Sequence, residues 1–171
     1  YANSFKDPSM IYLALDIGAR TSEINRMDAD WLDLKNGVVR IPKEDAAKNR
    51  EDWICPLKDE TVRILDRWLE ERGASEKYDD RTALWLTKYG NRYDKDSLRT
   101  VFRNIAEDAG FDLGTRDLSP YSIRHSTGNY AEAGGGLATA AKQRRHKSKE
   151  TTKKYSHSGV EQQRDTLNRL E

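Results

Sequence analysis

A hairpin signal near the start of the chain constrains the fold more than any other sequence feature. Two short apolar segments, 31–34 and 38–41, are joined by Asn36-Gly37, and this dipeptide favours a tight turn because both of its residues readily take a positive φ. A third strand-like segment, 53–57, follows after a polar loop. The sequence therefore predicts a small antiparallel sheet of three short strands.

Most of the remaining sequence predicts helices. Apolar residues recur with a helical period in 9–17, 59–72 and 96–109. Each segment is followed by a glycine that ends the helix, namely Gly18, Gly73 and Gly110. Further helices are expected after a cap at Thr21 or Ser22, from Ser119 with Pro120 in the first turn, from about Leu137 after a break at 134–136, and beyond Gly159. We expect one mainly α domain with a small three-stranded antiparallel sheet.

Length and composition narrow the class of protein. A chain of 171 residues fits a single domain, no apolar run is long enough to span a membrane, and no basic-then-apolar leader opens the sequence. The lone Cys55 excludes an internal disulfide and a cysteine-based metal site, which suits a reducing cytoplasm. The three histidines, His125, His146 and His157, show no ligand-like spacing, so neither a metal nor a cofactor is expected.

Positive charge is concentrated in one segment, although the net charge is only +1. Between residues 142 and 155 every formally charged side chain except Glu150 is basic. Salt screens charges that lie more than about 10 Å apart, so a local basic segment can bind phosphate whatever the charge elsewhere. A solvated basic helix face is the alternative. On the first interpretation, contacts to DNA phosphates come from Lys142, Arg144, Arg145, Lys147 and Lys149.

Four side chains spread along the chain have the chemistry to cleave a phosphodiester without a metal. Arg20 and Arg124 are always charged, and two guanidiniums can neutralise the non-bridging oxygens in the transition state. Tyr155 follows His146 by nine residues; its phenol can attack once its proton is lost, and the imidazole can donate to a phosphoryl oxygen. Taken singly, each has a simpler explanation, a surface ion pair for an arginine and a solvated position for the other two.

The order and spacing of these residues resemble the catalytic domain of tyrosine recombinases, the phage-integrase family that shares its chemistry with type IB topoisomerases. One matching box is 12–24, an apolar helix followed by Gly-x-Arg and an acidic residue three places on, and the others are 119–125 and 146–155. The resemblance covers the chain from Met10 to Tyr155. It implies the recombinase catalytic-domain fold for a single domain at 1–171, with the family's N-terminal, DNA-clamping core-binding domain absent from this chain.

The resemblance implies a role for each matched residue. Arg20 and Arg124 stabilise the transition state, and His146 contributes to that stabilisation. Tyr155 is the nucleophile. Glu23 orients Arg20 or a neighbouring cation rather than reacting, although a capping carboxylate in the first turn of a helix is an alternative explanation for it.

A general acid for the leaving 5′ oxygen is implied in the loop before the third strand. In the family the catalytic lysine precedes a Pro-Leu at a strand end, and Lys48 precedes Pro56-Leu57 by the same interval, 56 − 48 = 8 residues. Lys43 competes with it and would be an ordinary loop lysine on this interpretation. We therefore expect Lys48 to protonate the 5′ oxygen.

Two residues depart from the family pattern. Tyr121 stands where the family usually has the histidine of His-x-x-Arg; its hydroxyl can donate to a phosphate oxygen but cannot act as a near-neutral base, which puts the deprotonation of Tyr155 in question. Arg145 replaces a usual glycine and adds a phosphate contact or tightens the turn. His125 lies one position beyond Arg124, and we expect it to pack against a neighbour of its helix.

The resemblance also implies the reaction. Tyr155 attacks a DNA phosphate to give a 3′-phosphotyrosine and a free 5′ hydroxyl, without ATP or Mg²⁺, and the 5′ hydroxyl of a second strand resolves the intermediate. The implied function is site-specific recombination of double-stranded DNA, as in the integration of a mobile element.

Family members assemble as homo-tetramers on DNA, and a monomer or weak oligomer is expected without it. The tail helix at 159–171 is expected to dock on a neighbouring subunit or back on its own domain. The expected location is the cytoplasm, in association with the nucleoid, of a prokaryotic cell or of one that carries the encoding virus or plasmid.

Three other interpretations are open. A type IB topoisomerase-like enzyme would use the same chemistry to relax DNA. A DNA-binding relative that no longer cleaves is suggested by Tyr121 and by the glycines at 134–136, which resemble the turn of a helix-turn-helix. A purely structural helical protein leaves unexplained the series Arg20, Lys48, Arg124, His146 and Tyr155.

Overall fold

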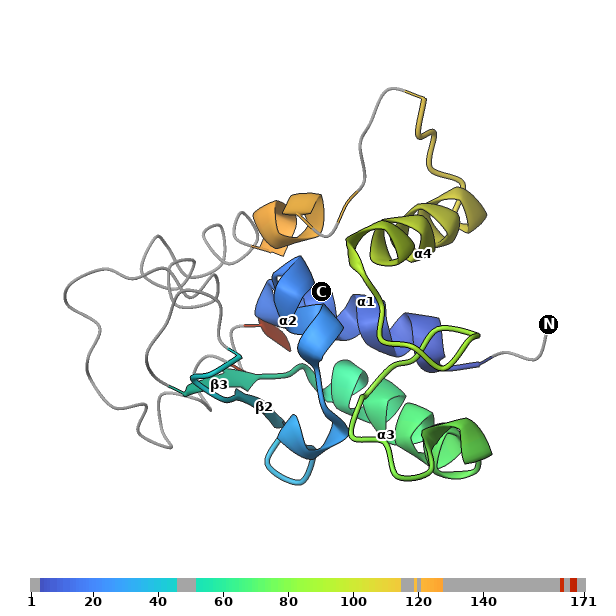
Figure 1. The fold of residues 1–171 in the computed structure, drawn as a ribbon. Helices are drawn as coiled ribbons and strands as arrows, with labels where there is room; N and C mark the ends of the chain where they lie inside the picture. The colour runs from blue at the N-terminus through green and yellow to red at the C-terminus, as the bar shows by residue number, and fades with distance from the viewer. Residues whose placement is uncertain are drawn as a thin grey trace.

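The computed structural model describes residues 4–45, 52–114, 119, 121–127, 164, 167 and 168. These residues form a group of helices with one small sheet at its side (Figure 1). The elements are α1 (Lys6–Ile17), α2 (Thr21–Arg26), η1 (Ala29–Trp31), β1 (Leu32–Asp33), β2 (Val38–Ile41), β3 (Trp53–Pro56), α3 (Asp59–Gly73), η2 (Glu76–Tyr78) and α4 (Lys95–Asp108), followed by a helix at 121–127. No helix in this part of the chain is long and apolar enough to cross a membrane.

The three strands form one antiparallel sheet in the order β1-β2-β3, which confirms the prediction. β2 is the central strand, with Val39 opposite Cys55 of β3. Within β2 only Arg40 is exposed, whereas Val38, Val39 and Ile41 are buried. The sheet therefore turns most of its central strand toward the core.

The turn between β1 and β2 differs from the predicted two-residue turn. It spans 34–37, and of these residues only Gly37 has a positive φ, of 62°. The Asp33 carboxylate accepts the backbone N–H of Asn36 at 3.2 Å and its side-chain amide at 2.8 Å. Because these hydrogen bonds hold Asn36 from outside the turn, the residue does not need the left-handed backbone on which the prediction rested.

The main helices match the predicted segments to within three residues. α1 begins at Lys6, earlier than predicted, because Pro8 fits within the first turn, where its missing N–H is not needed. It ends at Gly18 as predicted, and the left-handed φ of 55° at that residue terminates the helix. α3 and α4 end close to the predicted glycines.

The helix at 121–127 begins with the predicted serine cap. The Ser119 N–H donates to the Ser122 hydroxyl at 2.9 Å, and the Ser122 N–H donates to the Ser119 hydroxyl at 3.4 Å. These reciprocal bonds satisfy N–H groups that the first turn of a helix leaves without partners. The predicted break at 134–136 and the helix from Leu137 lie outside the described residues.

α1 is the centre of the core and lies between α4 and α3 (Figure 1). Its buried face carries Met10, Leu13 and Ile17, which belong to the same apolar cluster as Leu65 of α3 and Leu98 of α4. Full burial of a side chain of this size stabilises the fold by about 1.5–3 kcal/mol. The C-terminal end of α1 is consequently held in a fixed place.

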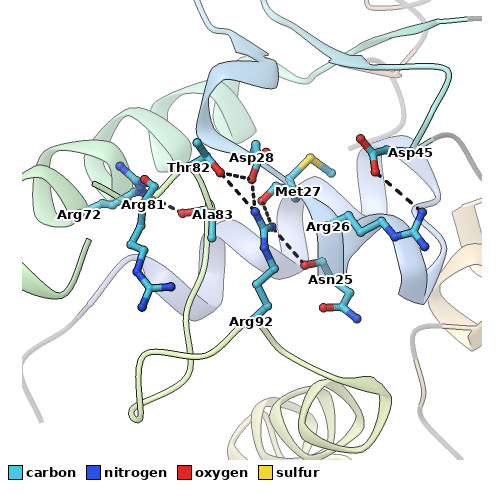
Figure 2. A network of polar contacts seen from close by, with 10 residues as sticks. All are labelled: Asn25, Arg26, Met27, Asp28, Asp45, Arg72, Arg81, Thr82, Ala83 and Arg92. Carbon is cyan, nitrogen blue, oxygen red and sulfur yellow. Dashed lines mark hydrogen bonds and ion pairs between the residues drawn. The ribbon is translucent and has the colours of Figure 1, made fainter. Parts of the chain in front are cut away.

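An arginine network fastens the irregular segment after η2 to the end of α2 (Figure 2). The Arg92 guanidinium donates to the carbonyl oxygens of Asn25 and Met27 at 3.4 and 3.3 Å, and to the Thr82 hydroxyl at 3.3 Å. It also pairs with the Asp28 carboxylate, which accepts the Thr82 hydroxyl at 3.0 Å. These contacts fix the end of α2 from a distant part of the sequence.

Candidate active site

The loop between α1 and α2 is the foundation of the candidate site. Gly18 ends α1 in a left-handed conformation, and its N–H donates to the Ala14 carbonyl. The chain then turns inward at Ala19, which is buried, and leaves Arg20 in an extended conformation as the N-terminal cap of α2. The Arg20 side chain is 23% exposed, so it has access to solvent while the backbone of Arg20 is fixed as the cap of α2.

Glu23 holds both ends of Arg20. Its Oε2 accepts the backbone N–H of Arg20 at 2.8 Å, and its Oε1 accepts the guanidinium Nη1 at 3.1 Å. The carboxylate is almost wholly buried, so the pair is screened little by solvent. The predicted cap at Thr21 or Ser22 is wrong, because the cap residue is Arg20, whose backbone N–H donates to Glu23, and Thr21 is already the first residue of the helix.

Arg124 reaches the same loop from the helix at 121–127. It is nearly buried, and its Nη1 donates to the Gly18 carbonyl oxygen, 106 residues away in sequence. On the same helix the Thr127 hydroxyl donates to the Leu15 carbonyl at 2.6 Å. The carbonyls at the end of a helix carry partial negative charge and lack helical partners, so the end of α1 is a natural dock for this cation. The structure thus brings Arg124 to within two residues of Arg20 along the loop.

The outer face of the same helix carries an aromatic pair. Tyr121 is 67% exposed, and its ring meets the His125 ring edge-on, with centroids 4.5 Å apart and planes at 71°. His125 is also exposed, and its ring contacts Tyr121 of its own helix. Arg124 and Thr127 lie on the inner face of the helix. Tyr121 and His125 are four positions apart and therefore share the opposite face.

A buried carboxyl lies just before the loop. Asp16 is buried, and its Oδ2 accepts the backbone N–H of Lys58, the residue before α3, at 2.7 Å. Burial raises the pKa of Asp16 to about 6, and the Lys58 N–H opposes the rise. The sequence analysis missed this residue; its signal is a carboxylate in an apolar helix, two places before Gly18.

The loop between β2 and β3 is held at its base. The Lys43 N–H donates to Asp52 Oδ1 at 2.9 Å, and the Asp45 carboxylate pairs with Arg26 of α2 at 3.8 Å. The Lys43 ammonium is largely exposed, and it pairs with Glu44 at 3.9 Å. The preferred general acid, Lys48, lies outside the described residues, as do His146, Tyr155 and the predicted phosphate contacts Lys142, Arg144, Arg145, Lys147 and Lys149.

Two residues near the C-terminus, Arg164 and Asn168, contact the start of α3 in their own chain. Arg164 Nε donates to the Asp59 carboxylate at 3.0 Å, and the Asp59 N–H donates to Asn168 Oδ1 at 3.4 Å. Leu167 is buried between these polar contacts along the sequence. Residues 164, 167 and 168 are helical.

The described part of the site has side chains whose chemistry suits an anion. Two guanidiniums are fixed at one loop, and an exposed phenol stands on the helix that carries the second of them. Among the described residues, no group of three His, Cys, Asp or Glu side chains is placed to hold a metal ion. Fixed cations beside a hydroxyl donor suit a phosphate oxygen as ligand.

The sequence matches a known protein family over most of its length. The phage integrase family matches residues 1–162. A tyrosine recombinase XerC of Bifidobacterium longum (strain DJO10A) is 28% identical over 170 residues, covering 94% of this chain and 46% of the relative. The putative integrase/recombinase y4rE of Sinorhizobium fredii is 32% identical over 117 residues, covering 68% of this chain and 36% of the relative. The chain spans about half the length of the XerC relatives it matches.

Solved structures share the fold. The XerA recombinase superposes with a TM-score of 0.72 at 16% identity, over 99% of this chain and 56% of that one. The XerH recombinase bound to its difH substrate gives 0.67 at 17% identity, over 95% of this chain and 42% of that one. The integrase of mycobacterium phage Brujita gives 0.65 at 20% identity, over 100% and 53%. The predicted fold class is thereby confirmed.

Proposed function

We propose that this chain, which belongs to the phage integrase family, is the catalytic domain of a tyrosine recombinase that cuts and rejoins double-stranded DNA at specific sites. The observation that carries the proposal is the convergence of Arg20 and Arg124 on the loop at the end of α1, where each is held by protein contacts. Cations fixed before the reaction stabilise a phosphoryl transition state without a reorganisation cost.

The proposed reaction passes through a covalent phosphotyrosine. The Tyr155 oxygen forms a bond to phosphorus while the bond from phosphorus to the 5′ oxygen breaks. The phenol loses its proton, and Lys48 supplies one to the 5′ oxygen. The 5′ hydroxyl of another strand then attacks the phosphotyrosine, which restores a phosphodiester and releases Tyr155. Because the energy of the phosphodiester is retained, no ATP is consumed.

The remaining site residues are proposed to bind the phosphate oxygens. Arg20, oriented by Glu23, and Arg124 contact the non-bridging oxygens, and each guanidinium can donate in pairs. Tyr121 donates its hydroxyl proton in a hydrogen bond from the exposed face of its helix, and His146 donates another. In this arrangement hydrogen-bond donors on several sides of the phosphate stabilise the negative charge of the transition state.

DNA is the proposed partner. The XerH structure contains its difH substrate, and a structure of the Tn1549 transposon integrase contains circular intermediate DNA. In the present chain the basic residues from 142 to 149 would contact phosphates, which position the duplex but do not read its sequence. Site choice would then depend on other contacts.

The assembly and location are part of the same proposal. We infer a homo-tetramer on DNA and a monomer or weak oligomer without it, with the tail at 159–171 able to dock on a neighbouring subunit. The contact of Arg164 with Asp59 in its own chain offers the alternative docking for a subunit without DNA. The protein would work in the cytoplasm at the nucleoid, in a prokaryotic cell or on behalf of its virus or plasmid.

A metal-free cleavage assay tests the proposal. The chain is incubated in EDTA with nicked duplexes carrying pooled random sequences, beside a Tyr155→Phe variant, and the products are separated on a denaturing gel. A covalent protein–DNA adduct in the parent that is absent from the variant is expected. An adduct that persists in the variant would show that another residue is the nucleophile.

Two other functions are distinguished by combining this assay with measurements of DNA binding, of relaxation and of junction resolution. Salt-sensitive DNA binding with no adduct would favour a DNA-binding relative that no longer cleaves, which Tyr121 in place of the usual histidine supports. Relaxation of supercoiled DNA without strand exchange would favour the topoisomerase-like activity. Resolution of a four-way junction would favour recombination.

A further inference from the structure

Tyr121 and His125 lie together on the exposed face of the helix at 121–127. The two rings meet edge to face, with centroids 4.5 Å apart and an angle of 71° between their planes. This is a favoured geometry for an aromatic pair, because the positive edge of one ring meets the negative face of the other. The contact therefore restricts the side chain of Tyr121 although most of that side chain is exposed to solvent.

The helix beneath the pair is held rigidly. Arg124 donates to the Gly18 carbonyl, and Thr127 donates to the Leu15 carbonyl at 2.6 Å. Both contacts lie on the inner face, so the backbone at positions 121 and 125 has a fixed relation to the loop between α1 and α2, which carries Arg20. These contacts do not fix the direction of the Tyr121 phenol, because an exposed tyrosine without a neighbour samples several rotamers.

We propose that His125 is a positioning residue that holds the Tyr121 phenol in the direction from which its hydroxyl donates to the DNA phosphate. The inference rests on the proposed function and deepens it at one residue. Tyrosine is longer than the histidine it replaces, so its hydroxyl lies farther from the helix and depends more on a lateral support. The ring of His125 provides that support through its face and edge, and proton transfer by the imidazole is not required.

Single-turnover cleavage of DNA tests the proposal with three variants. His125→Ala is expected to lower the cleavage rate constant about 3- to 10-fold, the range for loss of one aromatic pair, with little change in the dissociation constant for DNA. His125→Phe keeps the ring contact and is expected to restore the rate. Ser126→Ala is the matched control, because Ser126 is exposed on the same helix and its hydroxyl only donates to the Ser122 carbonyl.

The hydroxyl of Tyr121 supplies a second check. The Tyr121→Phe variant lacks the hydroxyl that donates to the phosphate. Adding His125→Ala to this variant is therefore expected to lower the cleavage rate no further. Equal effects of His125→Ala in both backgrounds would overturn the proposal. So would a His125→Phe variant as slow as His125→Ala, because that result assigns the effect to the imidazole nitrogens.

A measurement without DNA separates this inference from the proposed function. In NMR spectra of the full chain with labelled histidine, the His125 signals are identified by their loss in His125→Phe. They are expected to shift in Tyr121→Ala, which removes the neighbouring ring current, and to shift much less in Tyr121→Phe. Unchanged His125 signals in Tyr121→Ala would overturn the pair even if the parent cleaves DNA. If the parent forms no adduct but the His125 signals still shift in Tyr121→Ala, the result would contradict the proposed cleavage and support the ring contact.

Discussion

Burial separates two otherwise equivalent ion pairs in this chain. Arg20–Glu23 and Arg67–Glu70 have the same three-residue spacing and the same N–O distance of 3.1 Å. The Glu23 side chain is 1% exposed, whereas that of Glu70 is 64% exposed. A buried carboxylate depends on its protein donors because water cannot replace them. Only the first pair is therefore expected to affect both stability and the site.

The substitution Glu23→Gln tests this difference. It keeps the shape of the side chain but removes the charge that faces the Arg20 guanidinium, so we expect the free energy of unfolding to fall by about 1–3 kcal/mol. The DNA cleavage rate should fall at least tenfold as Arg20 loses its orientation. Glu70→Gln is the matched control and should stay within about 0.5 kcal/mol of the parent. Urea denaturation measures the first quantity, and equal effects of the two substitutions would contradict the argument.

Asp16 makes stability depend on pH. Its folded-state pKa is raised from 3.8 to about 6, chiefly by burial, so the folded state favours the protonated form. The stabilisation from this group is complete below about pH 4 and is lost as the pH rises through 6. Each pKa unit corresponds to about 1.4 kcal/mol, which sets an upper bound of about 3 kcal/mol for the loss.

The variant Asp16→Asn removes this titration but keeps an oxygen that can accept the Lys58 N–H. We expect the variant to gain stability relative to the parent between pH 4 and 7, and to exceed it by about 1–3 kcal/mol at pH 7.5. Urea denaturation at pH 4, 5, 6 and 7.5 measures the difference. A difference between the two proteins that stays constant across this range would show that Asp16 does not titrate as described.

At the scale of elements, the docking of the helix at 121–127 onto the end of α1 builds the candidate site. Their contact uses side chains of the helix at 121–127 to reach backbone carbonyls at the end of α1. Arg124 and Thr127 reach Gly18 and Leu15 in this way. Backbone carbonyls are fixed by the helix that carries them, so the docking sets the position of Arg124 with little freedom.

The nearly isosteric change Thr127→Val tests the docking. It removes the hydrogen bond to Leu15, and we expect a loss of about 1–2 kcal/mol in the free energy of unfolding, together with cleavage slowed about 3- to 10-fold as Arg124 loses a support. Thr100→Val is the matched control, since the Thr100 hydroxyl is exposed and only donates to Asp96 of its own helix, at 3.0 Å. Thermal or urea unfolding of both variants makes the comparison. The docking would be unimportant if Thr127→Val resembled the control.

At the scale of the whole molecule, Arg92 joins regions 64 to 67 residues apart in sequence (Figure 2). It satisfies two carbonyls at the end of α2 and one carboxylate, Asp28. The end of α2 also carries Arg26, the partner of Asp45, so this network supports the helix that Arg20 caps and the base of the β2–β3 loop.

Arg92→Met tests the network. It keeps much of the apolar stem but leaves Asp28 and two carbonyls without these donors, so we expect the free energy of unfolding to fall by about 2–3 kcal/mol. Arg81→Met is the control, because Arg81 is exposed and only its backbone carbonyl takes part in the contacts of Figure 2. Guanidinium denaturation compares the two. A loss in Arg92→Met no larger than that in the control would show that the network is not stabilising.

Local pattern was enough to predict the elements and the order of the candidate residues. Helical period and glycine stops located α1, α3 and α4, and the apolar segments around Gly37 located the sheet, because these signals act over a few residues. The same local logic failed at the cap of α2, where the cap residue is Arg20 in place of Thr21 or Ser22.

The sequence by itself determined that this is a mainly helical recombinase-like chain with a guanidinium after Gly18 and another on a serine-capped helix. Only the tertiary structure decided that Arg124 reaches the loop that carries Arg20, that Glu23 is buried against Arg20, and that Tyr121 faces outward against His125. The physical reason is range: caps and periodicity depend on neighbours within a turn or two, whereas the contact of Arg124 with Gly18 spans 106 residues and forms only when the core around α1 brings both ends together.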